Sequence, residues 1–166
     1  FSTWGPETPQ FSPNAAVVVG QDNFSGRDPN RGTGIPGDTR FNRPIDATAA
    51  GGKIWVVDSF NHRVLRHNSG SGLVIGNAEA VLGQVAMSAG APNLTEGREV
   101  NYPGGIALDY SSNPPRVYVA DTFNNRVLGF RDIRRLRSGE KADLVLGQPD
   151  LSSTVVNYPG GQSETP

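Results

Sequence analysis

A twelve-residue segment that occurs twice without a gap constrains the fold of this chain more than any other feature. The first copy covers residues 54–65 and the second covers residues 117–128, and seven of the twelve positions are identical. A repeat at a fixed spacing of 63 residues indicates an architecture in which successive units bury their surfaces against one another. The chain is therefore expected to fold as a series of similar units.

Two further signatures recur at a similar spacing. A short apolar run that ends in Gly-Gln occurs at residues 17–21, 80–84 and 144–148. The hexapeptide Val-Asn-Tyr-Pro-Gly-Gly at 100–105 recurs at 156–161, and residues 41–44 are a divergent copy of its beginning. These three signatures keep the same order along the chain, so they define the limits of each unit.

The predicted organisation has five parts. They are an N-terminal extension (1–14), the fourth strand of a preceding unit (15–21, with Ala16–Gly20 as the strand), a first repeat with a long entry loop (22–84), a second repeat (85–148) and the start of a third (149–166).

Each full repeat is predicted to contain four short strands. Runs of β-branched and aromatic residues alternate with clusters of Gly, Pro, Asn and Ser, which favour turns. The predicted strands are 45–49, 53–57, 63–67 and 79–82 in the first repeat and 106–109, 116–120, 126–130 and 143–146 in the second. Several strands are apolar at successive positions, which is typical of a sheet covered on both faces. Four strands per repeated unit indicate an all-β fold of β-propeller type, with two complete blades.

Composition excludes several classes of protein. The 21 glycines and 13 prolines suit many short strands joined by turns, and the absence of cysteine excludes disulfides, thiolate metal sites and a cysteine nucleophile. A formal net charge of −1 disfavours a general nucleic-acid binder, which usually carries a basic excess. No apolar run approaches the roughly 20 residues of a membrane-spanning helix.

The duplicated segment is predicted to form a tight hairpin between the second and third strands. An aspartate that ends a strand can accept hydrogen bonds from turn amides, and an asparagine tolerates the left-handed conformation that such a turn can require. The phenylalanines of the turn are expected to pack at the edge of the unit. The residues assigned to holding the two turns are Asp58, Asn61, Arg63, Asp121, Asn124 and Arg126.

The repeats resemble the NHL-repeat family. Its strand, strand and turn signatures are matched by residues 103–109, by Tyr-Val-Ala-Asp at 118–121 and by Asn-Asn-Arg-Val at 124–127, while the first copy has Asn-His-Arg at 61–63. Leu-Gly-Gln-Pro-Asp at 146–150 is similar to repeats of large, mostly bacterial proteins. The resemblance covers residues 15–161 and implies a six-bladed propeller.

Two blades leave an open sheet face at each end, so the resemblance also implies partners. These are the remaining blades of a longer chain, or other copies or subunits. The first residue is Phe1 rather than methionine, which indicates a processed form or a fragment. A location outside the cytoplasm is therefore expected: secreted, periplasmic or on the cell surface.

The long loops 22–40 and 85–101 are expected on the same side of the molecule as the hairpins, because strand directions alternate. This side is the candidate face for binding a protein or a small ligand. Its candidate residues are Arg27, Arg31, Arg40, His62, Arg98, Tyr102 and Asn125. Acidic residues balance the arginines of these loops, which favours a solvated loop over an anion site.

One basic run lies between the third and fourth strands of the second repeat, and it is expected on the opposite side. Asp132 is predicted to cap a short helical turn that ends at Gly139. RNA-binding members of the family use a basic face, so this run is the candidate for RNA binding, although a solvated loop is favoured. Its basic residues are Arg131, Arg134, Arg135, Arg137 and Lys141.

Neither a metal site nor a catalytic set is predicted. His62 and His67 are five residues apart with no spaced third ligand, whereas a zinc site needs three or four. Asp58 and Asp121 are equivalent positions in successive units, so they are not expected to form a catalytic pair. No cofactor is predicted. Asn23 and Asn93 begin N-glycosylation sequons on the long loops, and they matter only if the source is a eukaryotic secretory pathway.

The sequence therefore predicts a non-enzymatic binding or structural module that mediates protein or ligand interaction or assembly. Two alternatives remain open. The chain could be part of a metal-dependent propeller lyase or hydrolase whose catalytic residues lie on other blades, or it could bind RNA through residues 131–141.

Overall fold

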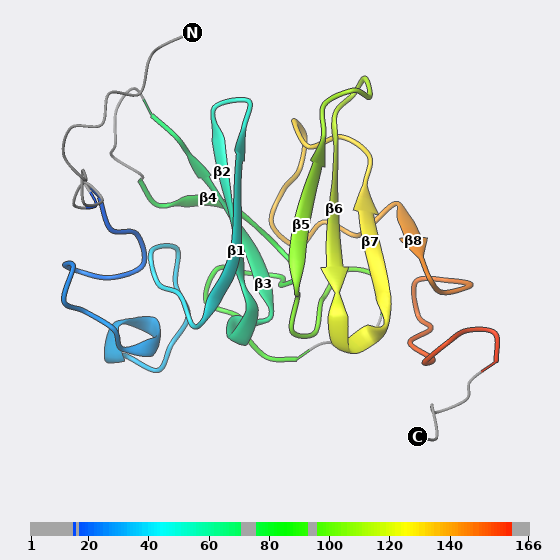
Figure 1. Cartoon of the computed structure of the whole chain (residues 1–166), viewed down its shortest axis with the longest axis horizontal. Coiled ribbons are helices and arrows are strands. Elements are labelled where there is room, and N and C mark those ends of the chain that lie inside the picture. Colours follow the sequence, from blue (N-terminus) through cyan, green and yellow to red (C-terminus); the bar gives the residue numbers. More distant parts are fainter. Residues whose placement is uncertain (1–14, 16, 71–75, 93–95, 161–166) are drawn as a thin grey trace, which may run out of the picture.

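The computed structural model describes residues 15, 17–70, 76–92 and 96–160, which form an all-β structure of two four-stranded antiparallel sheets (Figure 1). The strands of the first sheet are β1 (Pro44–Ala50), β2 (Lys53–Asp58), β3 (Arg63–Asn68) and β4 (Ala78–Leu82). Those of the second are β5 (Gly105–Asp109), β6 (Arg116–Asp121), β7 (Arg126–Phe130) and β8 (Leu144–Leu146). Short 3-10 turns are η1 (Pro29–Gly32), η2 (Ser59–Asn61) and η3 (Thr122–Asn124).

All eight predicted strands are present, and each begins and ends within one residue of its predicted limit. In both sheets each strand pairs with the next one along the chain, so the sheet orders are β1-β2-β3-β4 and β5-β6-β7-β8. The two sheets correspond to the two complete units that the sequence predicts. The ring of six units remains a prediction.

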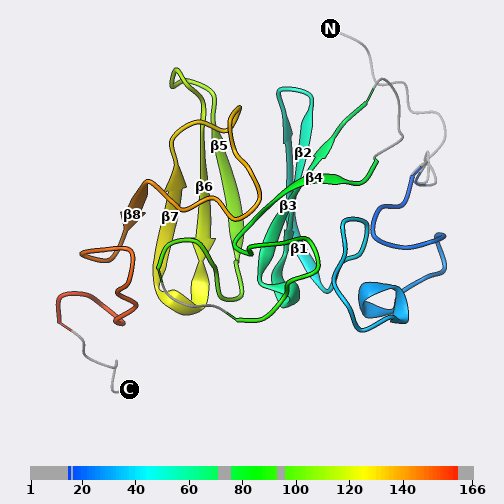
Figure 2. The same cartoon turned by 180° about the vertical axis from the view of Figure 1, so that it is seen from behind.

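The two sheets pack against each other, with β1 and β5 in contact and with β4 and β8 far apart (Figures 1 and 2). One buried apolar cluster fills the space between them, and removal of this surface from water stabilises the junction. Its members from the first sheet are Trp55, Val57, Val64 and Leu82, and those from the second are Val117, Val119, Leu128 and Phe130.

The connection between β7 and β8 completes this cluster. Figure 2 shows it crossing from the second sheet toward the first, where Ile133 and Leu136 become buried. Arg66 of β3 donates hydrogen bonds to the carbonyl oxygens of both residues, over 2.9 and 3.2 Å. Asp132 caps a turn as predicted, since its carboxylate accepts the backbone N–H of Arg134 at 3.0 Å, but no helical turn continues to Gly139, because the connection forms only turns and bends. Its carbonyl groups bind the first sheet instead of continuing a helix.

A second cluster covers the other face of the first sheet. Phe41 packs there with three valine and leucine side chains of β2, β3 and β4, and Val19 and Met87 lie at its margin. Strand β2 is therefore buried on both faces, as its run of successive apolar residues predicts. Strand β6 differs, because its alternate side chains are fully buried on only one face.

The strand predicted at Ala16–Gly20 is not present in residues 17–20, and Ala16 lies outside the described residues. By analogy with β4, which pairs with β3, this segment would need the third strand of a preceding unit as its partner. The described residues contain no such strand, so its backbone groups have no ladder to join. Gly20 nevertheless keeps a left-handed φ of 92°, close to the 81° and 87° of its repeat counterparts Gly83 and Gly147.

We expect Leu128→Ala to lower the free energy of unfolding by about 2–5 kcal/mol, because the Leu128 side chain is fully buried between the sheets. The matched control is Leu146→Ala on the neighbouring strand β8, where the leucine is 48% exposed and the expected loss is below about 1 kcal/mol. Urea titration of both variants measures the difference. Equal losses would show that the junction between the sheets does not form in solution.

His67 makes the free energy of unfolding depend on pH, because its side chain is fully buried on β3 against Phe41. Burial lowers its pKa below the ordinary 6.5, so below about pH 6.5 protons bind the unfolded chain more strongly than the folded one. The unfolding free energy should therefore fall as the pH falls through this range, by up to about 1.4 kcal/mol per pH unit.

His67→Phe tests this effect, because phenylalanine occupies the equivalent position, Phe130, in the second repeat. The stability difference between the variant and the parent chain, measured by urea titration, should grow in favour of the variant from pH 7 to pH 5. A difference that is constant over this range would contradict the assignment.

Candidate functional site

The two hairpins at the lower end of the sheets in Figure 1 have the same construction. In each, an aspartate ends a strand, a 3-10 turn follows, and the next residue adopts the left-handed conformation. The left-handed residues are His62 (φ 52°) and Asn125 (φ 53°). The preceding asparagines, Asn61 and Asn124, were expected in that role but belong to the 3-10 turns, so the chain reverses one residue later than predicted.

A buried ion pair holds each hairpin together. The Nε of Arg63 lies 2.7 Å from Oδ2 of Asp58, and Arg126 and Asp121 have the same geometry, with all four side chains fully buried. The other aspartate oxygen in each hairpin accepts the backbone N–H of Asn42 or Asn101. The amide groups of Asn61 and Asn124 donate to the same carboxylates at 2.8–3.0 Å.

Arg63 also fixes both long loops to the first hairpin. Its guanidinium donates to the carbonyl oxygens of Gly37 and Arg40 at 2.9 and 2.8 Å, and to that of Met87. The long loops therefore lie on the hairpin side. Burial raises the pKa of the Asp58 carboxyl, and the Arg63 guanidinium opposes this rise. These groups have no exposed surface, so their chemistry is to hold the turn and the loops rather than to contact a ligand.

Three glutamines repeat another anchoring contact. The amide nitrogens of Gln84 and Gln148 donate to the carbonyl oxygens of the left-handed hairpin residues, His62 and Asn125, at 2.9 Å. Each also donates to the carbonyl seven residues further on, at 2.8 Å. Gln21 makes the second contact, at 2.9 Å. Gln84 and Gln148 therefore fix the start of the loops that follow them against a hairpin, whereas Gln21 closes the start of its own loop.

A row of aromatic side chains lies against this buried framework. The ring of Tyr102 stands between those of Phe60 and Phe123, at centroid distances of 5.1 and 4.7 Å. The guanidinium of Arg43 lies 4.6 Å from the centroid of Phe60 and extends the row. Phe60 is 39% exposed and Phe123 is 62% exposed. We call Arg43, Phe60, Tyr102 and Phe123 the aromatic row.

His62 packs against Tyr102 and supports the row from the inside of the molecule. It is buried, its ring centroid lies 4.3 Å from that of Tyr102, and its Nδ1 accepts the backbone N–H of Tyr102 at 3.1 Å. Burial lowers the pKa of His62, which keeps the imidazole neutral at pH 7. Tyr102 itself has a φ of 45°, a left-handed value that is uncommon for a residue with a bulky side chain.

The other predicted residues of the binding face are engaged in local contacts. Arg31 pairs with Asp22 at 2.9 Å, and Arg98 pairs with Glu96 at 2.8 Å. Arg40 donates to the Thr33 hydroxyl, and Asn125 donates to the Thr154 carbonyl. Arg27 borders a hollow of about 330 Å³ beside Phe41 and Arg43.

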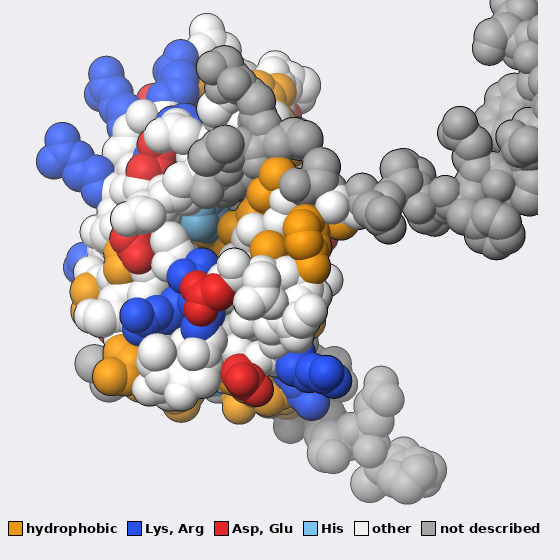
Figure 3. Space-filling model, turned by 90° about the vertical axis from the view of Figure 1, so that its left-hand side faces the viewer, with side chains coloured by type: hydrophobic (Ala, Val, Ile, Leu, Met, Phe, Trp, Pro, Cys, Tyr) orange, Lys and Arg blue, Asp and Glu red, His pale blue; other side chains and the backbone are white. Residues whose placement is uncertain are grey.

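The structure thus brings His62 and Tyr102 together, whereas the loop arginines lie apart. Figure 3 shows acidic and basic side chains interspersed on the side that carries the first loop. Sequence reasoning did not assign Phe60 or Phe123 to the binding face, and it placed Arg43 only among the arginines of the first loop, not beside Phe60. The available signal was that phenylalanine occupies the same place in both hairpins, and that Arg43 and Tyr102 occupy the same place before a proline.

The basic run lies at the other end of the sheets, as its place between β7 and β8 requires. Asp132 pairs with two of its arginines, at 3.0 and 3.8 Å. The aliphatic residues of the run are buried, while its basic side chains are exposed: Arg131, Arg134, Arg135, Arg137 and Lys141.

Neither sequon determines a site. Asn23 is exposed, and its side-chain oxygen accepts the backbone N–H groups of Ser25 and Gly26, both at 2.9 Å. Asn93 lies outside the described residues. In the described part of the chain, no group of three or more His, Cys, Asp or Glu residues could hold a metal ion. No helix there is long and apolar enough to cross a membrane.

No model of a known protein family matches the chain, and no curated protein matches it.

Arg63→Met should lower the free energy of unfolding by about 3–5 kcal/mol, because it leaves the Asp58 carboxylate buried without its partner. Arg126→Met is the matched comparison. It breaks the equivalent ion pair, with Asp121, but releases only the Leu151 carbonyl, whereas Arg63 holds three loop carbonyls. We therefore expect the larger loss for Arg63→Met in urea titrations. Equal losses would show that the loop carbonyls contribute nothing to stability.

Proposed function

We propose that this chain is a section of a β-propeller of the NHL-repeat type, which acts as a non-enzymatic binding and structural module. The internal repeat supports the propeller, as does the consecutive antiparallel order of both sheets. The arrangement of the sheets gives further support. Strands β1 and β5 meet while β4 and β8 diverge, which is the geometry of units arranged around an axis.

The aromatic row is the observation that carries the binding function. Large apolar side chains that are exposed together mark interaction surfaces, and aromatic residues with arginine dominate the binding energy of such surfaces. The row rests on two hairpins that buried ion pairs hold in place, so its rings are fixed before a partner arrives. Preorganisation of this kind reduces the entropy lost on binding. We propose that the row binds segments of other proteins.

The basic run supports RNA binding less well. Ile133 and Leu136 are buried between the sheets, and Arg66 holds their carbonyl groups, so the run has a structural task. Asp132 also offsets part of its charge. Nothing among the described residues favours the enzyme alternative over binding.

The test is selection from a random peptide display library against the chain, followed by affinity measurement on the double variant Phe60→Ser, Phe123→Ser. Selected peptides should lose at least about tenfold in affinity for this variant, because both phenylalanines are exposed and stand on either side of Tyr102 in the row. A matched control, Arg134→Ser with Arg135→Ser, removes two exposed side chains at the opposite end and should bind like the parent. Peptides that bind all three proteins equally, or a failure to select any, would contradict the proposal.

A further inference from the structure

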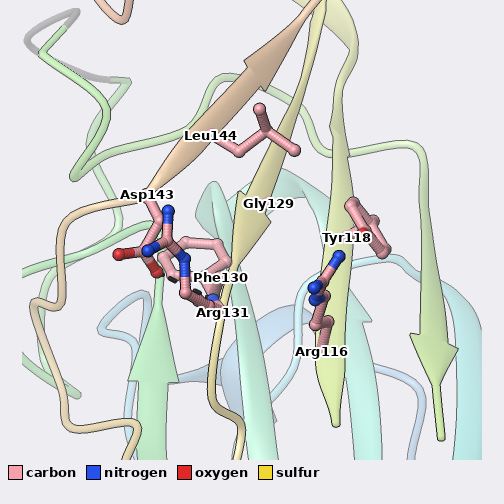
Figure 4. Close-up of a pocket in the computed structure, with 7 residues that line it drawn as sticks. All are labelled: Arg116, Tyr118, Gly129, Phe130, Arg131, Asp143 and Leu144. Carbon is pink, nitrogen blue, oxygen red and sulfur yellow. Dashed lines mark hydrogen bonds between the residues drawn. The ribbon is translucent and has the colours of Figure 1, made fainter. Parts of the chain in front are cut away.

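None of the described residues covers the apolar face of the second sheet that points away from the first sheet. Cross-strand pairs place Tyr118 beside Gly129 and place Gly129 beside Leu144, so these residues lie on one face of β6, β7 and β8. Leu144 and Leu146 are 43% and 48% exposed. A hollow of about 400 Å³ opens on this face, bordered by Arg116 and Arg131 (Figure 4).

The repeat supplies a counterpart for each of these residues on the first sheet. Tyr118 corresponds to Trp55, Leu144 to Ala80 and Leu146 to Leu82. The strand registers agree, because Trp55 pairs with Arg66 as Tyr118 pairs with Gly129. All three counterparts are at most 2% exposed. The same surface is therefore buried on one sheet and open on the other.

The structure shows what covers the counterpart surface. The second sheet packs on it, and the β7–β8 connection inserts Ile133 and Leu136 beside Trp55. The guanidinium of Arg66 lies 5.4 Å from the centroid of the Trp55 ring, and it donates to the carbonyl oxygens of both inserted residues. The hollow left at this place is about 220 Å³, roughly half of the open one.

We infer that the open face of the second sheet binds the β3–β4-type connection of another four-stranded unit. The connection inserts two aliphatic side chains, three residues apart, into the hollow beside Tyr118. Gly129 occupies the position that Arg66 has in the first repeat, so this position supplies no guanidinium. The carbonyl groups of the connection meet Arg116 and Arg131 instead, which border the hollow. Two arginines face one carboxylate here, that of Asp143, so the connection that fits is neutral or acidic.

This inference depends on the junction inside the chain. It depends neither on the aromatic row nor on the number of units in a ring. The aromatic row lies at the hairpin end of the sheets, and none of its residues borders the hollow. The inference does rest on the proposed architecture of repeated units, so loss of peptide binding at the aromatic row leaves it standing, whereas failure of the probe to bind this face would count against the propeller as well.

The probe is a synthetic cyclic peptide that copies residues 131–143 with glutamine in place of the arginines at 134, 135 and 137. We expect it to shift the amide signals of Tyr118, Gly129 and Leu144 in the NMR spectrum of the ¹⁵N-labelled full chain, with saturation. The matched peptide carries Ile133→Asp and Leu136→Asp and should bind at least tenfold more weakly. Equal binding of the two peptides, or no shift of these three amides, would overturn the inference.

Two variants of the chain give opposite results if the inference is right. Leu144→Glu places a charge in the apolar face at an exposed position and should weaken the probe at least tenfold. Gly129→Arg recreates Arg66 and should tighten binding about tenfold, through hydrogen bonds to two carbonyl groups. Its Cβ would lie 3.1 Å from the Tyr118 ring, so that ring must shift slightly.

The variant Phe60→Ser, Phe123→Ser should bind the probe as the parent does. Unchanged affinity in both Leu144→Glu and Gly129→Arg would overturn the inference.

Discussion

The buried aspartate–arginine pair at each hairpin is the interaction on which the rest of this structure depends. A fully buried ion pair is stable only when its remaining donors and acceptors find partners. Here Asp58 accepts from Asn42 and Asn61, and Arg63 donates to three loop carbonyls. The need to satisfy two buried charges therefore determines where the turn reverses, how the segment before β1 is held and where both long loops lie.

A second constraint comes from packing across the junction. Along each strand, side chains alternate between the two faces of the sheet. The apolar face that one sheet buries at the junction therefore determines which face of the neighbouring sheet packs against it. Short strands cannot enclose such a junction alone, and the β7–β8 connection closes it with Ile133 and Leu136. The same connection carries exposed basic side chains, so one segment serves packing on one side and solvation on the other. The open face of the second sheet follows directly, because the described residues contain no further sheet to cover it.

The aromatic row shows how a buried hairpin framework can present exposed side chains without a change in its core. The buried pairs occupy the inside of each hairpin, and the phenylalanines of the same turns therefore point outward. Tyr102 bridges the two units, and its N–H is held by His62. Its left-handed backbone is shared by its repeat counterpart Arg43, so the conformation belongs to the repeat rather than to the contact with His62. Strained residues of this kind persist when the surrounding contacts determine them, and they occur often at functional sites.

The sequence by itself determined the all-β class, the eight strands and the two hairpins. These features depend on local sequence, and each occurs in both repeats. The sequence pattern therefore predicted the type of each element and placed the strand limits to within one residue. Only the tertiary structure decided that Ile133 and Leu136 are core residues, that Phe60 and Phe123 meet around Tyr102, and that residues 17–20 form no strand. Each of these depends on partners far away in the sequence. A charged loop hides two buried aliphatic residues until a facing sheet is in place, and a strand-like segment forms no ladder when its neighbour is missing. The periodic pattern specifies a unit, whereas the contacts between units follow from which faces come together in three dimensions.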